Sequence, residues 1–189
     1  MGLSIHYSGN IRDISMIEAL VSETADICKS LEWDFHVLEY PNDDMLNGII
    51  FSPPGSEPVV LTFLPSGRLC SPFNLVNKAL YGQNGLDTEL LYTCSTKTQY
   101  AGADTHEILI KLLRYFKDKY FAAFELEDES MYWETMDRGV LLSQFAKYDY
   151  LLDTTMNKLG EMGSVEREPI ATLAERIEQM MRDRLTRPD

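Results

Sequence analysis

The chain has 189 residues, of which 44% are hydrophobic and 11% aromatic, and its formal net charge is −13 at pH 7. This length and composition suit one packed globular core and exclude disorder over most of the chain. The negative charge argues against binding to nucleic acid or to anionic membranes, because both need lysine and arginine to displace counterions.

The first half of the chain alternates between strand and helix patterns. Period-two alternation marks half-buried strands, and recurrence at three and four residues marks helices. These patterns predict a strand over 3–7, a helix over 14–31 and a second strand over 35–38. Two β-branched and aromatic runs joined by a Pro/Gly-rich loop predict an antiparallel hairpin over 47–64. We expect Gly9-Asn10 to end the first strand, and the stretch 71–87 remains ambiguous between a short helix and an irregular segment.

The second half predicts a strand, a long helix, another strand and further helices. Cys94, Thr96 and Thr98 alternate along the strand, so they share one of its faces. The predicted elements are a strand over 90–100, a helix over 104–120, a strand over 121–126 and helices over 139–159 and 170–185. The last helix carries a full apolar stripe between Ile170 and Leu185, which predicts packing against this chain or, in a homodimer, against a second copy.

The order strand, Tyr-x-Gly, helix, strand occurs twice, around Tyr7-Ser8-Gly9 and Tyr100-Ala101-Gly102. We interpret the segments 3–38 and 97–126 as halves of an internal duplication. Gly9 and Gly102 would supply either a positive φ or room for close backbone approach.

The fold class that these patterns favour is α+β. We expect a mixed, mostly antiparallel sheet with two long helices on one face and a C-terminal helical pair. The sheet domain would cover 1–137, and 138–189 would form a helical extension packed on it.

The three cysteines, Cys28, Cys70 and Cys94, are far apart and form no CxxC motif, which excludes a zinc ribbon or a thioredoxin-like site. Reduced thiols fit a cytoplasmic protein. No signal peptide is visible, and no apolar run approaches the ~20 residues that span a bilayer. We therefore expect a soluble cytoplasmic protein with no cofactor.

The most informative segment for function is 124–137, which holds six carboxylates and no lysine or arginine. Uncompensated carboxylates repel one another, and aromatic residues beside them can anchor a partner. The residues predicted to bind a partner are Glu127, Asp128, Glu129, Tyr132, Trp133 and Glu134. A divalent-cation site, or a solvated turn with Trp133 in the core, would also explain the pattern.

Sequence motifs for phosphate binding, dinucleotide binding, α/β-hydrolase and zincin chemistry are absent. The leading hypothesis is a non-catalytic intracellular interaction module that neutralises a basic effector, in the manner of an immunity protein or antitoxin. The alternative is a small metal-dependent or acid–base enzyme. Its side chains would be His6 and His36, on one face of neighbouring strands, with carboxylates such as Glu39 or Glu134. Whether the protein is an enzyme, and which residues would hold a metal, the sequence leaves open.

Overall fold

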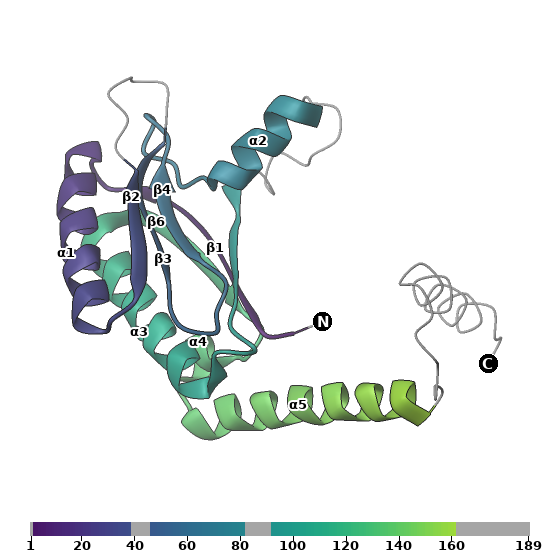
Figure 1. The fold of residues 1–189 in the computed structure, drawn as a ribbon. Helices are drawn as coiled ribbons and strands as arrows, with labels where there is room; N and C mark the ends of the chain where they lie inside the picture. Colours follow the sequence, from purple (N-terminus) through teal and green to yellow (C-terminus); the bar gives the residue numbers. More distant parts are fainter. Residues whose placement is uncertain (1, 39–45, 82–91, 162–189) are drawn as a thin grey trace. The chain divides into compact units, whose positions relative to one another are not determined.

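The computed structural model describes residues 2–38, 46–81 and 92–161 of the chain. Its elements, in chain order, are β1 (Ser4–Ile11), a 3-10 helix (Ile14–Met16), α1 (Ile17–Ser30), β2 (Asp34–Leu38), β3 (Asn47–Ser52), β4 (Val59–Phe63), α2 (Pro72–Tyr81), β5 (Cys94–Lys97), α3 (Gly102–Tyr120), β6 (Phe121–Asp128), α4 (Tyr132–Thr135) and α5 (Arg138–Glu161) (Figure 1). None of the helices within these ranges is long and apolar enough to cross a membrane.

The chain divides into two compact units, Met1–Tyr148 and Asp149–Asp189. Helix α5 therefore begins in the first unit and continues into the second. At its start, Leu141 and Phe145 are buried in the core of the first unit. The candidate site lies entirely within that first unit.

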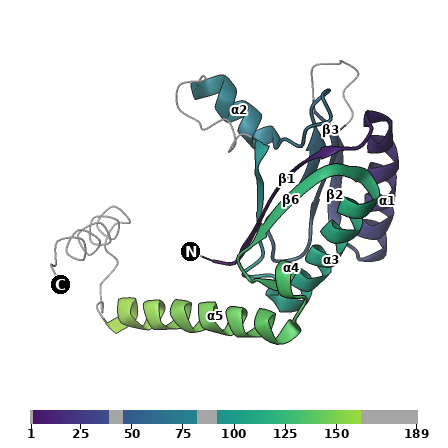
Figure 2. The same cartoon turned by 180° about the vertical axis from the view of Figure 1, so that it is seen from behind.

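Six strands form two three-stranded antiparallel sheets in the described part of the chain. One sheet has the order β5-β1-β6 and the other has the order β2-β3-β4. Figure 2 shows β1 and β6 running side by side. Because β5 and β6 both pair antiparallel to β1, they are parallel to each other, and α3 makes the crossover between them.

The two sheets are joined around β4 and the turn that follows it. Leu69 donates its N–H to the carbonyl of Gly9 at 2.9 Å and forms a bridge with Phe63. The Tyr7 hydroxyl of β1 reaches the other sheet, where it accepts the Val60 N–H at 2.8 Å and donates to the Val60 carbonyl at 3.1 Å. Burial raises the pKa of Tyr7 far above its usual value, so the phenol stays neutral and can make both bonds.

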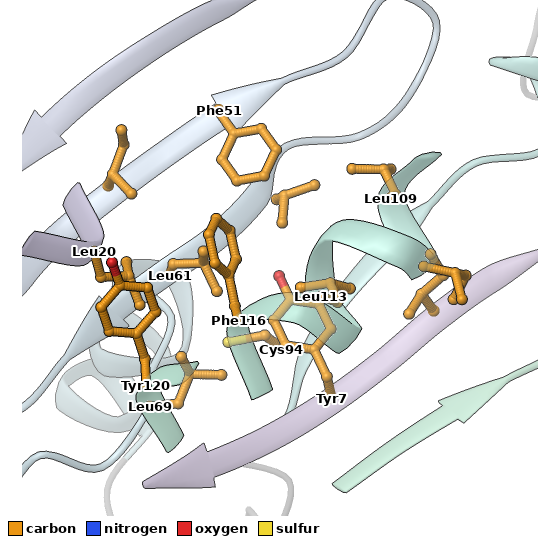
Figure 3. Close-up of a cluster of buried hydrophobic side chains, with 14 of the residues drawn as sticks. Tyr7, Leu20, Phe51, Leu61, Leu69, Cys94, Leu109, Leu113, Phe116 and Tyr120 are labelled. Atoms are coloured by element: carbon orange, nitrogen blue, oxygen red, sulfur yellow. The ribbon is translucent and has the colours of Figure 1, made fainter. Parts of the chain in front are cut away.

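The core collects side chains from both sheets and from helices α1 and α3 (Figure 3). Leucine and aromatic residues dominate it, and each one fully buried contributes about 1.5–3 kcal/mol of hydrophobic stabilisation. The residues labelled in Figure 3 are Tyr7, Leu20, Phe51, Leu61, Leu69, Cys94, Leu109, Leu113, Phe116 and Tyr120. Their spacing matches the apolar stripes and strand alternations from which the elements were predicted.

The predicted class, α+β, is confirmed, but the single mixed sheet is wrong, because the strands form two separate antiparallel sheets. The expected end of the first strand at Gly9-Asn10 is also wrong, since β1 continues to Ile11. Glycine is needed inside that strand because a Cβ at Gly9 would lie 2.6 Å from the Ala123 carbonyl oxygen of β6. In the second Tyr-x-Gly segment, by contrast, Gly102 adopts a positive φ of +83°, a backbone conformation that favours glycine.

The two predicted repeat halves pair their strands differently. β1 and β2, which flank α1, belong to different sheets, whereas β5 and β6, which flank α3, belong to the same sheet. This pairing gives no support to a duplication of 3–38 and 97–126, which stays a prediction. Helix 139–159 is found as α5, while the helix predicted between Ile170 and Leu185, with its dimer, lies outside the described residues.

Candidate functional site

The outer face of the β5-β1-β6 sheet is polar and carries carboxylates. In the antiparallel register, His6 lies opposite Glu127 and Ser8 lies opposite Glu125. Directly paired residues point to the same face, so these four side chains share the face opposite to Tyr7. Glu125 and Glu127 are exposed there, whereas Tyr7 on the other face is buried in the core.

The exposed carboxylates Glu125 and Glu127 of β6, and Glu134 in the corner after it, have no cationic partner among the residues that the structure describes. Within the described residues, Glu125, Glu127 and Glu134 form no ion pair. Some acidic side chains elsewhere have a cationic partner: Glu23 pairs with Lys119 at 2.9 Å, and Glu107 lies beside Lys111 at 2.6 Å. That Lys111 hydrogen bond is the main cause that lowers the pKa of Glu107 to about 2.

The corner that follows β6 is held by the buried carboxylate of Asp128. Its Oδ1 accepts the N–H of Ser130 at 2.8 Å, and its Oδ2 accepts the N–H groups of Tyr132 and Trp133, both at 2.9 Å. Two residues at this corner, Met131 and Met136, adopt positive φ values of 62° and 51°. Such conformations are unfavourable for methionine. The bonds from Ser130 and Tyr132 to Asp128 hold the chain on both sides of Met131, and Met136 donates its N–H to the Tyr132 carbonyl at 2.8 Å.

His106 connects this corner to two other elements. Its Nδ1 lies 2.7 Å from the hydroxyl of Thr98, just after β5, and its Nε2 lies 2.9 Å from the hydroxyl of Ser130. The same Nε2 is 3.1 Å from Oδ1 of Asp128. The ring also meets Phe145 of α5 edge-on, with 5.7 Å between ring centroids. One buried imidazole on α3 thus fixes the end of β5, the corner after β6 and the start of α5.

The pKa of Asp128 is lowered by its surroundings. Burial by itself would raise it, but the hydrogen bond and charge of His106 and the hydrogen bonds from Ser130 outweigh burial. The ionised carboxylate therefore belongs to the folded structure at neutral pH.

A serine, a histidine and an aspartate in contact resemble the components of a nucleophilic triad, but their geometry differs from one. In a triad, the serine and the carboxylate bind opposite nitrogens of the imidazole. Here Ser130 and Asp128 both approach Nε2, and the Ser130 hydroxyl donates to Asp128 at 2.8 Å. All three residues are at most 2% exposed, so no substrate reaches the hydroxyl in this structure. The cluster is structural.

Trp133 lies beside β6 and is half-buried. Its ring meets Phe124 of β6 with centroids 6.2 Å apart. Two cations from α3 approach the same indole, with Arg114 at 4.5 Å and Lys117 at 5.4 Å from its centroid. The edge of β6 thus has an acidic outer face and an aromatic inner side flanked by cations.

The six residues predicted to bind a partner are divided by the structure. Asp128 and Tyr132 are only 2% exposed, so they stabilise the corner and are not available at the surface. Glu127, Glu129 and Glu134 are exposed, and Trp133 is half-buried. Partner binding stays a prediction for these last four.

The two histidines of the alternative hypothesis lie in different sheets, His6 in β1 and His36 in β2. The expectation that they belong to neighbouring strands is therefore wrong. It failed because α1 carries the chain from one sheet to the other. Glu39 lies outside the described residues, and Glu134 is exposed on α4. Across the described ranges, no three His, Cys, Asp or Glu side chains are grouped so that they could hold a metal ion.

The sequence did not predict that His106 contacts Thr98 and Ser130. The alternation did place Cys94, Thr96 and Thr98 on one face of the strand, and all three are buried. Nothing in the sequence links that strand end to Ser130, which is 32 residues further along the chain.

A hollow of about 890 Å³ lies away from this site, between α1 and β2. Ile14, Val21 and Phe35 are among the residues that line it, and none of the residues of the His106 cluster takes part.

Comparisons of the chain with protein-family models, with curated proteins and with solved structures found no match.

Proposed function

We propose that this protein is a non-catalytic protein-binding module that binds a basic partner through the exposed carboxylates of β6 and the corner after it. The observation that carries the proposal is that Glu125, Glu127 and Glu134 are exposed and form no ion pair in the described structure, whereas Glu23 and Glu107 on the helices have cationic partners. Neighbouring unpaired carboxylates destabilise a fold through repulsion. A cationic partner would relieve that repulsion and be steered to this surface.

The rigid corner supports this proposal. Because Asp128 and His106 hold the chain after β6 in a fixed conformation, the exposed carboxylates need not be ordered when a partner binds. Preordering reduces the entropic cost of association. Neutralisation of a basic effector is one function that such a surface would serve.

The proposal is tested by quantitative affinity capture from a lysate of the native host. The test protein carries Glu125→Gln, Glu127→Gln and Glu134→Gln. We expect wild-type protein to enrich a basic protein, and we expect added salt and the triple variant to abolish that enrichment.

A matched control removes three carboxylates from a different surface, with Glu18→Gln, Glu32→Gln and Asp34→Asn, all of which are exposed. This control should capture the same partner as wild type, because Glu125, Glu127 and Glu134 are intact. Its net charge equals that of the triple variant, so the comparison separates the position of the carboxylates from the total charge. If both variants bind equally poorly, net charge alone governs the interaction. If both bind as well as wild type, these carboxylates do not contribute to binding, and in either case the proposed surface is wrong.

A further inference from the structure

We infer that the outer edge of β6 is a docking site for an extended basic segment of a partner, which pairs with β6 as an additional strand. This inference rests on the proposed function and specifies how the partner binds. It commits to a partner strand in which lysine or arginine alternates with apolar residues.

The direction of the backbone groups in β6 follows from bonds at its ends. Glu129 donates its N–H to the Ser4 carbonyl at 3.2 Å, so its backbone faces β1. Successive residues of a strand direct their N–H and C=O groups to alternate sides. Glu127 and Glu125 therefore also bond to β1, and Phe124 and Leu126 direct their backbone groups away from the sheet.

These outward groups are unpaired in the structure. Among the residues described, none forms a hydrogen bond with the outward N–H or C=O of Phe124 and Leu126. Both residues are only half-buried. The row of unpaired outward groups along β6 ends at Asp128, whose carbonyl accepts the N–H of Met131 at 3.0 Å. An unpaired row of this kind is a template for another strand.

The opposite edge of the same sheet is closed. On β5, the Lys97 carbonyl accepts the N–H of Glu57 at 2.9 Å, and the Lys97 N–H donates to the Glu57 carboxylate at 3.0 Å. An additional strand would therefore pair with this sheet at β6 and not at β5.

Charge complementarity selects the chemistry of the occupant. On the outer face, a strand added to β6 would place every second side chain next to Glu125 and Glu127, where lysine or arginine would be favoured. The alternate side chains would lie near Phe124 and Trp133. Apolar side chains suit that side, because Arg114 and Lys117 already surround the indole and would repel further cations.

The test uses the full chain, labelled for NMR, and a short synthetic peptide of alternating lysine and valine. We expect saturable binding and at least about tenfold slower hydrogen exchange at the amides of Phe124 and Leu126. The matched control peptide has the same sequence and charge but is N-methylated at every amide, which blocks both of its edges and prevents strand pairing. We expect it to leave the exchange of both amides unchanged.

A charge-reversed protein provides the second measurement. Glu125→Lys with Glu127→Lys should weaken binding of the lysine–valine peptide by at least about tenfold. Glu18→Lys with Glu32→Lys, on another surface, should bind more tightly than this variant. Thermal melting of both variants shows whether they remain folded, and the exchange measurement on wild type does not depend on them.

The outcomes separate the two proposals. If the peptide does not bind, or if the N-methylated peptide binds as tightly and Phe124 and Leu126 stay unprotected, strand addition is overturned. The proposed function survives that result when the lysate partner is still lost on neutralising Glu125, Glu127 and Glu134. If the lysate partner is indifferent to those carboxylates, the proposed function fails whatever the peptide does.

Discussion

Replacing Asp128 with asparagine tests the buried cluster that shapes the site. Its Oδ1 accepts the Ser130 N–H and lies 3.1 Å from His106 Nε2, while its Oδ2 accepts two backbone N–H groups and the Ser130 hydroxyl. Asparagine keeps the shape but turns one of the two oxygens into an N–H donor. If Oδ2 is replaced, three donors face a donor. If Oδ1 is replaced, the Ser130 N–H faces a donor and the negative charge beside His106 Nε2 is lost as well.

The magnitude follows from the bonds that are lost. A hydrogen bond to a charged group contributes about 1.5–3 kcal/mol, so losing two predicts that Asp128→Asn lowers the free energy of unfolding by about 3–5 kcal/mol. Urea unfolding followed by tryptophan fluorescence and by circular dichroism would measure it. The control Glu127→Gln, at the adjacent exposed position, should change that free energy by less than about 0.5 kcal/mol.

The same variant predicts a pH dependence. The pKa of Asp128 is lowered in the folded state, because the His106 and Ser130 interactions outweigh burial. The stability that it contributes is therefore present above the ordinary aspartate pKa of ~3.9 and is lost as the pH falls below it. The difference in the free energy of unfolding between wild type and Asp128→Asn should become smaller below about pH 4. A loss under about 1 kcal/mol at neutral pH, or a difference that does not narrow in acid, would refute the reasoning.

Three further predictions each concern one or two residues. Gly102→Val should lower the free energy of unfolding by more than ~1 kcal/mol, because Gly102 has φ +83° and a β-branched residue is strained there; an unchanged melting temperature would show that the backbone relaxes. Tyr7→Phe should lower the free energy of unfolding in urea by about 1–3 kcal/mol, since it leaves the half-buried Val60 N–H without its acceptor; a neutral result would mean that water replaces the hydroxyl. Burial raises the pKa of the Cys28 thiol to about 11, so a thiol reagent at pH 8 should label it, and the buried Cys94, only as fast as the protein opens; rapid labelling of the folded protein would contradict this.

Local patterns in the sequence were sufficient to locate most of the helices and strands. Periodicity located α1, α3 and α5, and alternation located β2, because the apolar spacing of each element reflects the one face that it buries. Runs of β-branched and aromatic residues joined by a Pro/Gly-rich loop located β3 and β4. The sequence did not predict the end of β1 correctly, because Gly9 allows close approach to β6 instead of breaking the strand. The segment 71–87 was ambiguous, and its first part forms α2.

The candidate site was only partly predictable. The density of carboxylates in 124–137 drew attention to the correct segment, since like charges without partners are visible in any sequence. The sequence did not show that Asp128 turns inward while Glu127 and Glu129 face the solvent. Strand parity offered a hint of this division, but the role of Asp128 depends on His106, which comes from a different element.

By itself, the sequence determined the acidic character of the protein, its α+β composition and the faces that its helices and strands bury. These properties are local, because charge and hydrophobic period belong to short stretches of chain. Tertiary structure decided that β1 and β2 enter different sheets, that His6 and His36 are separated, and that β6 is an edge strand. It also brought Thr98, His106 and Asp128 together in one buried cluster. Those outcomes depend on which strands pair, and strand pairing is settled by packing between distant segments, which no short stretch of sequence encodes.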